Sequence, residues 1–200
     1  MRLLVPFAVA ALATTPIAAQ QVTGQPAGNF RLTDADGKPV SLVQFKGRPV
    51  VLEWNNPGCP FVQKHYDSGN MQATQAKAKA AGAVWLTINS GAPGKQGYMT
   101  GPEAKSFVAT RKAVPTAYLL DPHGRVGKGY AAKTTPHLYV IDAAGRLAYQ
   151  GAIDDRPTAD KADIIGARNH VLAALGEVKA GKRVSVPETR PYGCSVKYAG

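Results

Sequence analysis

The chain has 200 residues, of which 44% are hydrophobic, and its two cysteines are too few for a disulfide-rich scaffold. The length suits one ordinary domain with a buried core. The formal net charge is +11 at pH 7, but the basic residues lie in short groups without interleaved aromatic residues. This pattern favours a solvated basic surface over nucleic-acid binding. No Cys-x-x-Cys pair and no zinc-type spacing of cysteine and histidine occurs, so neither a cofactor nor a metal is expected.

The amino terminus is typical of a secretory signal peptide. Arg2 is the only charged residue before residue 31, an apolar run follows over residues 3–13, and Ala18-Ala19-Gln20 forms a small-residue cleavage site. We expect cleavage after Ala19, which removes Arg2 and lowers the net charge to +10. The run is too short to span a bilayer, so we expect an exported protein that is not integral to the membrane. In a Gram-negative source it would be periplasmic.

The expected domain organisation follows from this cleavage. Residues 1–19 are the signal peptide, 20–27 a leader, 28–180 the folded domain, and 181–200 a polar carboxy-terminal tail that carries Cys194. Residues 20–29 look loose and polar.

In the first half of the domain, strands and helices alternate. Residues 30–34 and 40–42 form a hairpin around the Asp36-Gly37 turn, and 50–54 form a buried strand. A helix from Pro60 is interrupted at 68–70, and Asn70 is the expected cap of a second helix over 71–81 that Gly82 closes. A strand over 83–89, a glycine-rich loop over 90–101 and a helix over 102–112 follow.

The second half continues with a strand over 116–121, a turn at 122–124 and a β-hairpin made of 138–142 and 147–152. A last helix is expected to carry apolar residues at helical spacing: Ile164, Ile165, Val171, Leu172, Leu175 and Val178. Alternating strands and helices with a final hairpin predict an α/β sandwich around a mixed sheet.

Cys59 is the strongest candidate for a functional residue. It follows the strand that ends in Trp54 and the turn residues Asn55 to Gly58, and Pro60 comes next. Because proline is favoured at the first position of a helix, Cys59 is placed at a helix amino terminus. The unpaired N–H groups and the dipole of that end stabilise a thiolate, so the sequence indicates a reactive cysteine. The alternative is a cysteine that is a small buried hydrophobic residue.

The segments around residues 30–47, 54–60 and 134–151 resemble the redoxin branch of the thioredoxin fold, the alkyl hydroperoxide reductase/thiol-specific antioxidant superfamily. The resemblance spans roughly residues 28–178 and is greatest to a peroxiredoxin-like group with a lone active-site cysteine. It implies a thioredoxin-like sandwich with an amino-terminal hairpin and a reactive thiol at Cys59. It also implies a cis-proline that faces this cysteine, beside a backbone edge that pairs with a bound polypeptide.

Two motifs compete for the cis-proline, Thr135-Pro136 and Val114-Pro115. Pro136 is preferred because a hairpin follows it directly, and an ordinary trans turn is the alternative. The pattern departs from two relatives of the fold. Val62 stands where thioredoxin has its second cysteine. Leu52 and Asn56 stand where peroxiredoxins have a proline and a hydroxyl residue that helps to activate peroxide.

The remaining candidates depend on what surrounds Cys59. Cys194 is either a resolving thiol, half of a permanent disulfide with Cys59, or a free thiol. Glu53 is a proton-transfer candidate if it is buried, and otherwise a surface carboxylate. His137 would approach the Cys59 thiolate from beside Pro136. Cys59 and His137 together could then bind copper. A structural histidine is the alternative.

Two functions stay open at this point. The first is a secreted thiol oxidoreductase in which Cys59 attacks the disulfide of a protein or small molecule, with peroxide as a further candidate substrate. The second is a non-catalytic module that binds peptide or copper and has a structural Cys59–Cys194 disulfide.

Overall fold

The computed structural model describes residues 21–199, so the expected signal peptide lies outside the described residues. Seven strands form a mixed sheet in the order β2-β1-β5-β4-β3-β7-β8. They are β1 (Arg31–Asp34), β2 (Pro39–Ser41), β3 (Val50–Trp54), β4 (Val84–Asn89), β5 (Ala117–Leu120), β7 (His137–Ile141) and β8 (Leu147–Gly151). Strands β3, β4 and β5 are parallel, and β7 runs antiparallel to β3.

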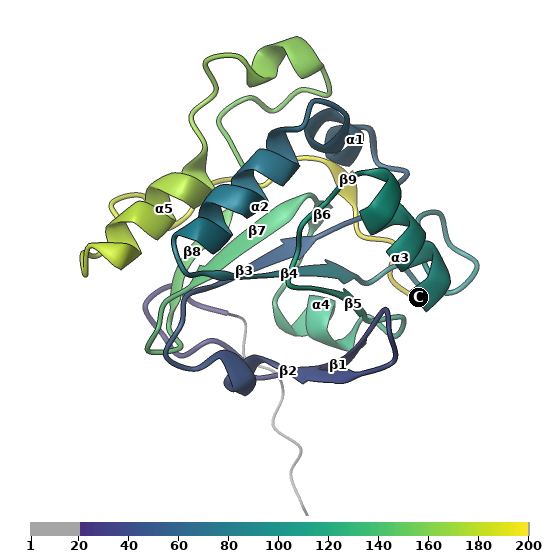
Figure 1. The fold of residues 1–200 in the computed structure, drawn as a ribbon, viewed down its shortest axis with the longest axis horizontal. Coiled ribbons are helices and arrows are strands. Elements are labelled where there is room, and N and C mark those ends of the chain that lie inside the picture. The colour runs from purple at the N-terminus through teal and green to yellow at the C-terminus, as the bar shows by residue number, and fades with distance from the viewer. Residues whose placement is uncertain (1–20, 200) are drawn as a thin grey trace, which may run out of the picture.

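Helices cover both faces of this sheet, which gives the thioredoxin-like α/β sandwich (Figure 1). Helices α1 (Pro60–Asp67), α2 (Asn70–Ala80) and α5 (His170–Lys179) lie on one face, and α4 (Arg125–Gly129) lies on the other. Helix α3 (Gly101–Thr110) packs beside β5. The short 3-10 helices η1 (Leu42–Phe45) and η2 (Lys161–Ile164) complete this part, and a separate two-stranded sheet pairs β6 (Thr134–Thr135) with β9 (Cys194–Ser195).

Strand β3 shows how the sequence pattern divides the core. All five of its residues are buried, and alternate side chains point to opposite faces of the sheet. Val51 joins the cluster under α1, α2 and α5. Leu52 and Trp54 join the cluster that η1, β1 and Tyr130 complete on the other face. Continuous burial of a central strand explains its apolar sequence, which only Glu53 interrupts.

Three local expectations are wrong. Residues 20–29 are not loose in their described part, because the Gly24 N–H donates to the Leu147 carbonyl (2.7 Å) and the Leu147 N–H donates to the Gln25 carbonyl (2.9 Å). Gly69, with φ of 75°, is the residue that precedes α2, so Asn70 is its first residue and not its cap. The Asn70 side chain contacts His65 instead.

The third correction concerns the last helix, which is only ten residues long. Ile164 ends η2, and Ile165 is 86% exposed. The Asn169 side chain accepts a hydrogen bond from the Leu172 N–H and so starts α5 at His170. The asparagine cap therefore sets the start of the helix, although the apolar spacing in the sequence begins before it. The boundaries of the domain and of the tail stay predictions.

A buried carboxylate ties β3 to the helices above it. Glu53 is 0% exposed, and burial raises its pKa although several hydrogen bonds to the carboxylate lower it in part. Five donors surround its two oxygens: Tyr66 Oη (2.7 Å), Trp85 Nε1 (2.8 Å), Thr87 Oγ1 (3.0 Å), Asn55 Nδ2 (3.2 Å) and Gln75 Nε2 (3.3 Å).

This environment predicts a pH-dependent contribution of Glu53 to stability. The pKa of the folded carboxyl lies above its ordinary value of 4.5. The stabilisation from holding the proton is therefore fully present below that pH and is lost as the pH rises through the folded pKa. In Glu53→Gln this titration is absent. We expect the unfolding free energy of the natural protein, relative to that of Glu53→Gln, to fall as the pH rises from about 4.5 to the folded pKa. The expected slope is roughly 1.4 kcal/mol per pH unit. Denaturant titrations at several pH values measure it, and a difference independent of pH would contradict the assignment.

Candidate thiol site

Cys59 lies at the amino terminus of α1, as the sequence predicts. It precedes Pro60, the first residue of the helix, and has extended backbone angles (φ −84°, ψ 122°). Its carbonyl accepts the first helical hydrogen bond from the Gln63 N–H (2.9 Å). The side chain is 1% exposed and belongs to the core cluster under α1, α2 and α5. Cys59 is thus both at a helix end and buried.

The Thr135–Pro136 peptide bond is cis, as the resemblance implies, and among residues 21–199 it is the one cis peptide bond. The competing Val114-Pro115 motif is therefore trans. Cys59 Sγ lies 3.0 Å from the Thr135 carbonyl oxygen, to which the thiol donates. The chain thus brings β6 and the start of α1 together, although 76 residues separate the two groups.

Cys194 reaches the same place from the carboxy-terminal tail. Strand β9 pairs antiparallel with β6, and Cys194 lies opposite Thr135 in the register. Both cysteines are free thiols, and Cys194 packs against the core cluster that contains Cys59. Pairing two residues of the tail with β6 therefore places the two thiols of the chain in contact.

The two thiols have opposite pKa shifts. Burial alone would raise the pKa of Cys59, but the Cys194 thiol and N–H, the Val62 N–H and the Thr135 hydroxyl stabilise the thiolate and bring its pKa below the ordinary value. Burial and the neighbouring Cys59 sulfur raise the pKa of Cys194 to about 11. Of the two thiols, Cys59 is therefore the one that ionises at the lower pH.

Trp54, His137 and Glu53 make their hydrogen bonds to groups other than the two cysteines. The Trp54 indole donates to Ser90 Oγ (3.0 Å) and packs against Tyr139. Burial lowers the pKa of His137 to about 3, and its Nδ1 accepts from the Lys133 N–H and lies 3.2 Å from Tyr139 Oη. The hydrogen bonds of His137 and Glu53 within the described chain all go to groups other than the cysteines. The approach of His137 to the thiolate is therefore not observed.

The position that corresponds to the peroxiredoxin hydroxyl is occupied by a side chain with other partners. Asn56 Oδ1 accepts from the Gly58 N–H (2.9 Å), and its Nδ2 donates to Gln96 Oε1 (2.9 Å). Gln96 belongs to the glycine-rich loop after β4. The amide of Asn56 therefore ties this loop to the turn before Cys59 and is not free to act on a ligand at the sulfur.

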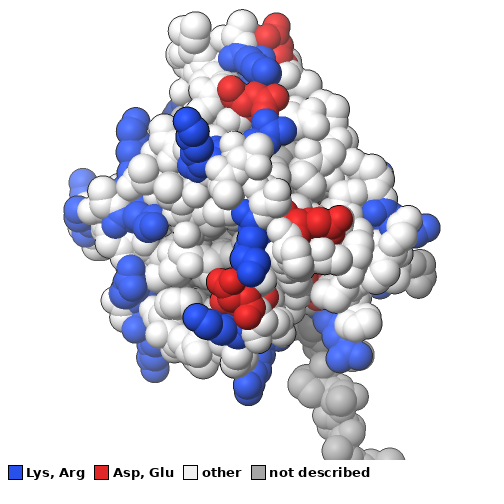
Figure 2. Space-filling model, turned by 45° about the vertical axis from the view of Figure 1, so that its right-hand side comes forward, with Lys and Arg blue, Asp and Glu red and all other residues white. Residues whose placement is uncertain are grey.

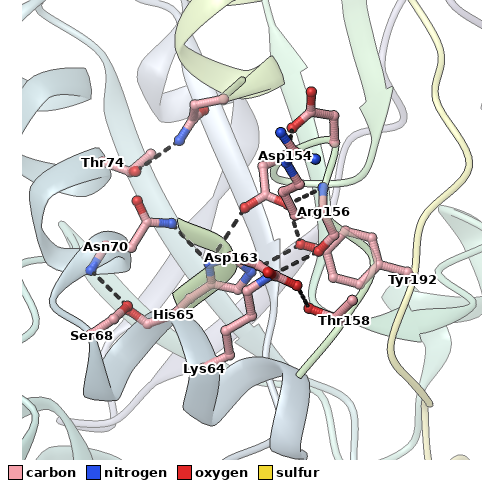
Figure 3. A network of polar contacts seen from close by, with 12 residues as sticks. Lys64, His65, Ser68, Asn70, Thr74, Asp154, Arg156, Thr158, Asp163 and Tyr192 are labelled. Atoms are coloured by element: carbon pink, nitrogen blue, oxygen red, sulfur yellow. Dashed lines mark hydrogen bonds and ion pairs between the residues drawn. The ribbon is translucent and has the colours of Figure 1, made fainter. Parts of the chain in front are cut away.

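A buried polar network beside α1 escaped the sequence analysis (Figure 3). Tyr192 Oη donates to Asp154 Oδ1 and lies 3.1 Å from His65 Nε2, while Asn70 Nδ2 lies 2.8 Å from His65 Nδ1. Because Tyr192 gives its proton to Asp154, His65 Nε2 is the donor to Tyr192 and Nδ1 accepts from Asn70. Burial lowers the pKa of His65 to about 4, so its ring is neutral at pH 7. The one sequence signal for this network is that two tyrosines, Tyr192 and Tyr198, flank Cys194 in an otherwise polar tail.

Residues 21–199 contain no group of three or more histidine, cysteine, aspartate or glutamate side chains arranged to hold a metal. They also contain no helix long and apolar enough to cross a membrane. On the face shown in Figure 2, lysine and arginine side chains are spread out with acidic residues between them and form no continuous track.

Solved structures with the same fold share most of the chain. An uncharacterised conserved protein from Geobacillus kaustophilus superimposes with a TM-score of 0.78 at 25% identity, over 90% of this chain and 94% of that one. A candidate thiol:disulfide interchange protein, DsbE, from Chlorobium tepidum superimposes with a TM-score of 0.57 at 28% identity, over 78% of this chain and all of that one.

Sequence comparison points to one family. Chloroplastic peroxiredoxin Q from Triticum aestivum is 32% identical over 134 residues, which are 60% of this chain and 54% of that protein. The chain thus matches about half the length of this curated relative. The sequence pattern of the AhpC/TSA family matches residues 23–150, more than half of the chain. With its thioredoxin-like sandwich, this protein belongs to the AhpC/TSA family.

Proposed function

We propose that this protein is a thiol–disulfide oxidoreductase in which Cys59 is the attacking thiol and Cys194 the resolving thiol. The observation that carries the proposal is the contact between the two cysteines at the cis Thr135–Pro136 bond, with their pKa values shifted in opposite directions. A thiolate beside a protonated thiol is the starting arrangement for a two-step exchange of disulfides.

The exchange takes place in two steps. The Cys59 thiolate attacks one sulfur of a substrate disulfide, forms a mixed disulfide and releases the other sulfur as a thiolate. Because the negative sulfur at Cys59 is then gone, one cause of the raised pKa of Cys194 disappears. Cys194 can then lose its proton and attack Cys59 Sγ, which releases the second substrate thiolate. The substrate disulfide is reduced to two thiols, the protein is oxidised to a Cys59–Cys194 disulfide, and an external dithiol must restore it.

The family and its relatives support this class of chemistry. The DsbE protein of similar fold is named for disulfide interchange, and the peroxiredoxin Q of Triticum aestivum is named as a peroxiredoxin. Between these activities the site favours disulfide exchange. Stabilising the departing oxygen of a peroxide needs donors around the sulfur, and Asn56 is instead bonded to Gln96. An exported location, periplasmic in a Gram-negative cell, would allow the Cys59–Cys194 disulfide to form and is part of the proposal.

A binding module with a permanent Cys59–Cys194 disulfide is the second candidate function. The burial of Cys59 favours it, because a buried sulfur is hard for a substrate to reach. A bridge between residues 59 and 194 would also close a long loop and stabilise the fold. The two functions differ in the reduction potential of the bridge, which a redox titration measures.

The test compares the mature protein with Cys59→Ser and Cys194→Ser. After mild oxidation, we expect peptide mapping to show a Cys59–Cys194 disulfide that opens at about −200 mV. With a disulfide substrate, Cys59→Ser should be inactive, and Cys194→Ser should stop at the mixed disulfide because no second thiol can attack it. A bridge that resists reduction below about −300 mV would instead support the binding module. If hydrogen peroxide oxidised Cys59 orders of magnitude faster than it oxidises an ordinary thiolate, the protein would be a peroxidase.

The pKa shifts give an independent prediction, read from the ultraviolet absorbance of the thiolate against pH. Since the Cys194 side chain donates to the Cys59 sulfur, the Cys59 pKa should be higher in Cys194→Ala than in Cys194→Ser, whose hydroxyl can still donate. In Cys59→Ser, the pKa of Cys194 should fall below about 11, because the sulfur that raises it is absent. Equal pKa values in the two Cys194 variants would show that the thiols do not interact.

A further inference from the structure

The carboxy-terminal tail occupies the groove above Cys59 as a bound strand would. In Figure 1 the yellow segment leaves α5 and crosses the molecule to β9, which lies beside β6. Beyond the two paired residues, the Val196 N–H donates to the Lys133 carbonyl (3.1 Å) and the Ala92 N–H donates to the Lys197 carbonyl (2.8 Å). Cys59 and Thr135 are each 1% exposed under this strand. An external disulfide can therefore reach Cys59 only if the tail moves away.

The tail crosses the cis peptide so closely that only glycine fits at one position. Gly193 has φ of +134°, and a Cβ built on it would lie 2.0 Å from the Thr135 carbonyl oxygen and 3.3 Å from the Pro136 nitrogen. The obstacles are backbone atoms that no side-chain rotation can remove. A strand that places a cysteine beside Cys59 in this manner must therefore have glycine immediately before that cysteine.

Tyr192, two residues before Cys194, fills a side pocket built from α1 and the segment after β8. Its ring packs against Phe61 (5.8 Å between centroids), and Lys64 Nζ lies 5.7 Å from the ring centre. Its hydroxyl donates to Asp154 and contacts His65, whose side chains are 2% and 0% exposed (Figure 3). Buried polar partners at the bottom of the pocket select a phenol, because a ring without the hydroxyl leaves them unpaired.

A second tyrosine anchors the other side of Cys194. Tyr198 Oη donates to the Ala132 carbonyl (2.8 Å). Its side chain packs against Gly124 and Gly127 so closely that a Cβ built on either glycine would lie 2.5 Å from the nearest Tyr198 atom. The tail is thus held at two points, four residues after the cysteine and two residues before it. Between these two anchors the strand is held by the β6–β9 pairing and by the backbone hydrogen bonds of Val196 and Lys197.

We propose that the groove formed by β6, the Thr135–Pro136 peptide and the Tyr192 pocket binds an extended polypeptide segment with the pattern Tyr-Gly-Cys, and that residues 191–198 are its built-in occupant. The tail leaves when such a segment of a partner protein docks, and it returns to bring Cys194 to the mixed disulfide. This inference rests on the proposed function for its biological meaning, but docking itself requires no covalent step.

The test is therefore a binding measurement without redox chemistry. The probe is a fluorescent peptide of residues 190–198 with serine in place of Cys194, and the protein is the full mature chain. In Gly193→Ala the tail cannot pass over Thr135, so the groove should be empty. We expect the peptide to bind at least about tenfold more tightly to Gly193→Ala than to the natural protein, whose tethered tail competes at an effective concentration on the order of millimolar.

Gly181→Ala is the matched control. Gly181 also has a positive φ, +68°, but a Cβ there would meet nothing within 4 Å. Alanine there should carry only the strain of an ordinary left-handed residue and leave the tail in place, so peptide binding should equal that of the natural protein. Tyr198→Ala is the second variant, since it loosens the tail without touching the Tyr192 pocket, and it too should increase binding if Gly193→Ala fails to fold.

The peptide variants test the pattern. Alanine in place of the peptide glycine should abolish binding, and phenylalanine in place of the first tyrosine should weaken it about tenfold, because Asp154 and His65 lose their partner.

Equal binding to all protein variants, or binding that neither peptide change alters, would overturn the proposal. Dimers of the natural protein that exchange tails, seen by sedimentation, would assign the groove to a second copy and would also overturn it. Because no thiol reacts in these measurements, either result leaves the test of Cys59 exchange chemistry independent.

Discussion

The crossing of the tail over the Thr135–Pro136 peptide is the contact on which the site depends. It brings Cys194 to Cys59, buries the Cys59 side chain and supplies two of the groups that stabilise the Cys59 thiolate. A thiolate at a helix end would have some stabilisation without it. Burial alone, however, acts in the opposite direction. The depressed pKa of Cys59 is therefore a property of the closed arrangement, and it is set by residues that lie far apart in the chain.

Helix α1 takes part in two buried polar networks, which connect it to different parts of the molecule. Glu53, which lies on β3, gathers donors from β4, α1 and α2 into one fully paired cluster. The network of His65, Tyr192 and Asp154 joins α1 to the tail, and Asp154 Oδ2 in it has no hydrogen-bond partner among the described residues. A paired network holds its elements firmly, whereas one with an unpaired buried oxygen is less stable. The network that holds the tail is accordingly the less stable of the two.

The sequence predicts the parts of this fold that depend on local pattern. The apolar strands, the turn before Cys59 and the hairpin after Pro136 lie where periodicity and turn residues indicate them. The misplaced last helix arose because Ile164 and Ile165 continue an apolar spacing that Asn169 interrupts by capping. The Tyr192 pocket could not be predicted, because its members come from residues 61–65, 154 and 192. Only folding brings such segments together, and the polar character of a tail says nothing about which strand it pairs with.

The packed leader and tail have a consequence for solubility. Strand β8 is at one edge of the sheet, and exposed edge strands promote association between molecules. Residues 24–25 bond to Leu147 at one end of β8, and Pro187 and Thr189 bond to Gln150 near the other. At the opposite edge, β2 has three residues and begins with Pro39, which has no N–H to offer. Within residues 21–199, one margin of the sheet is therefore covered and the other is short, which disfavours pairing with a strand of another molecule.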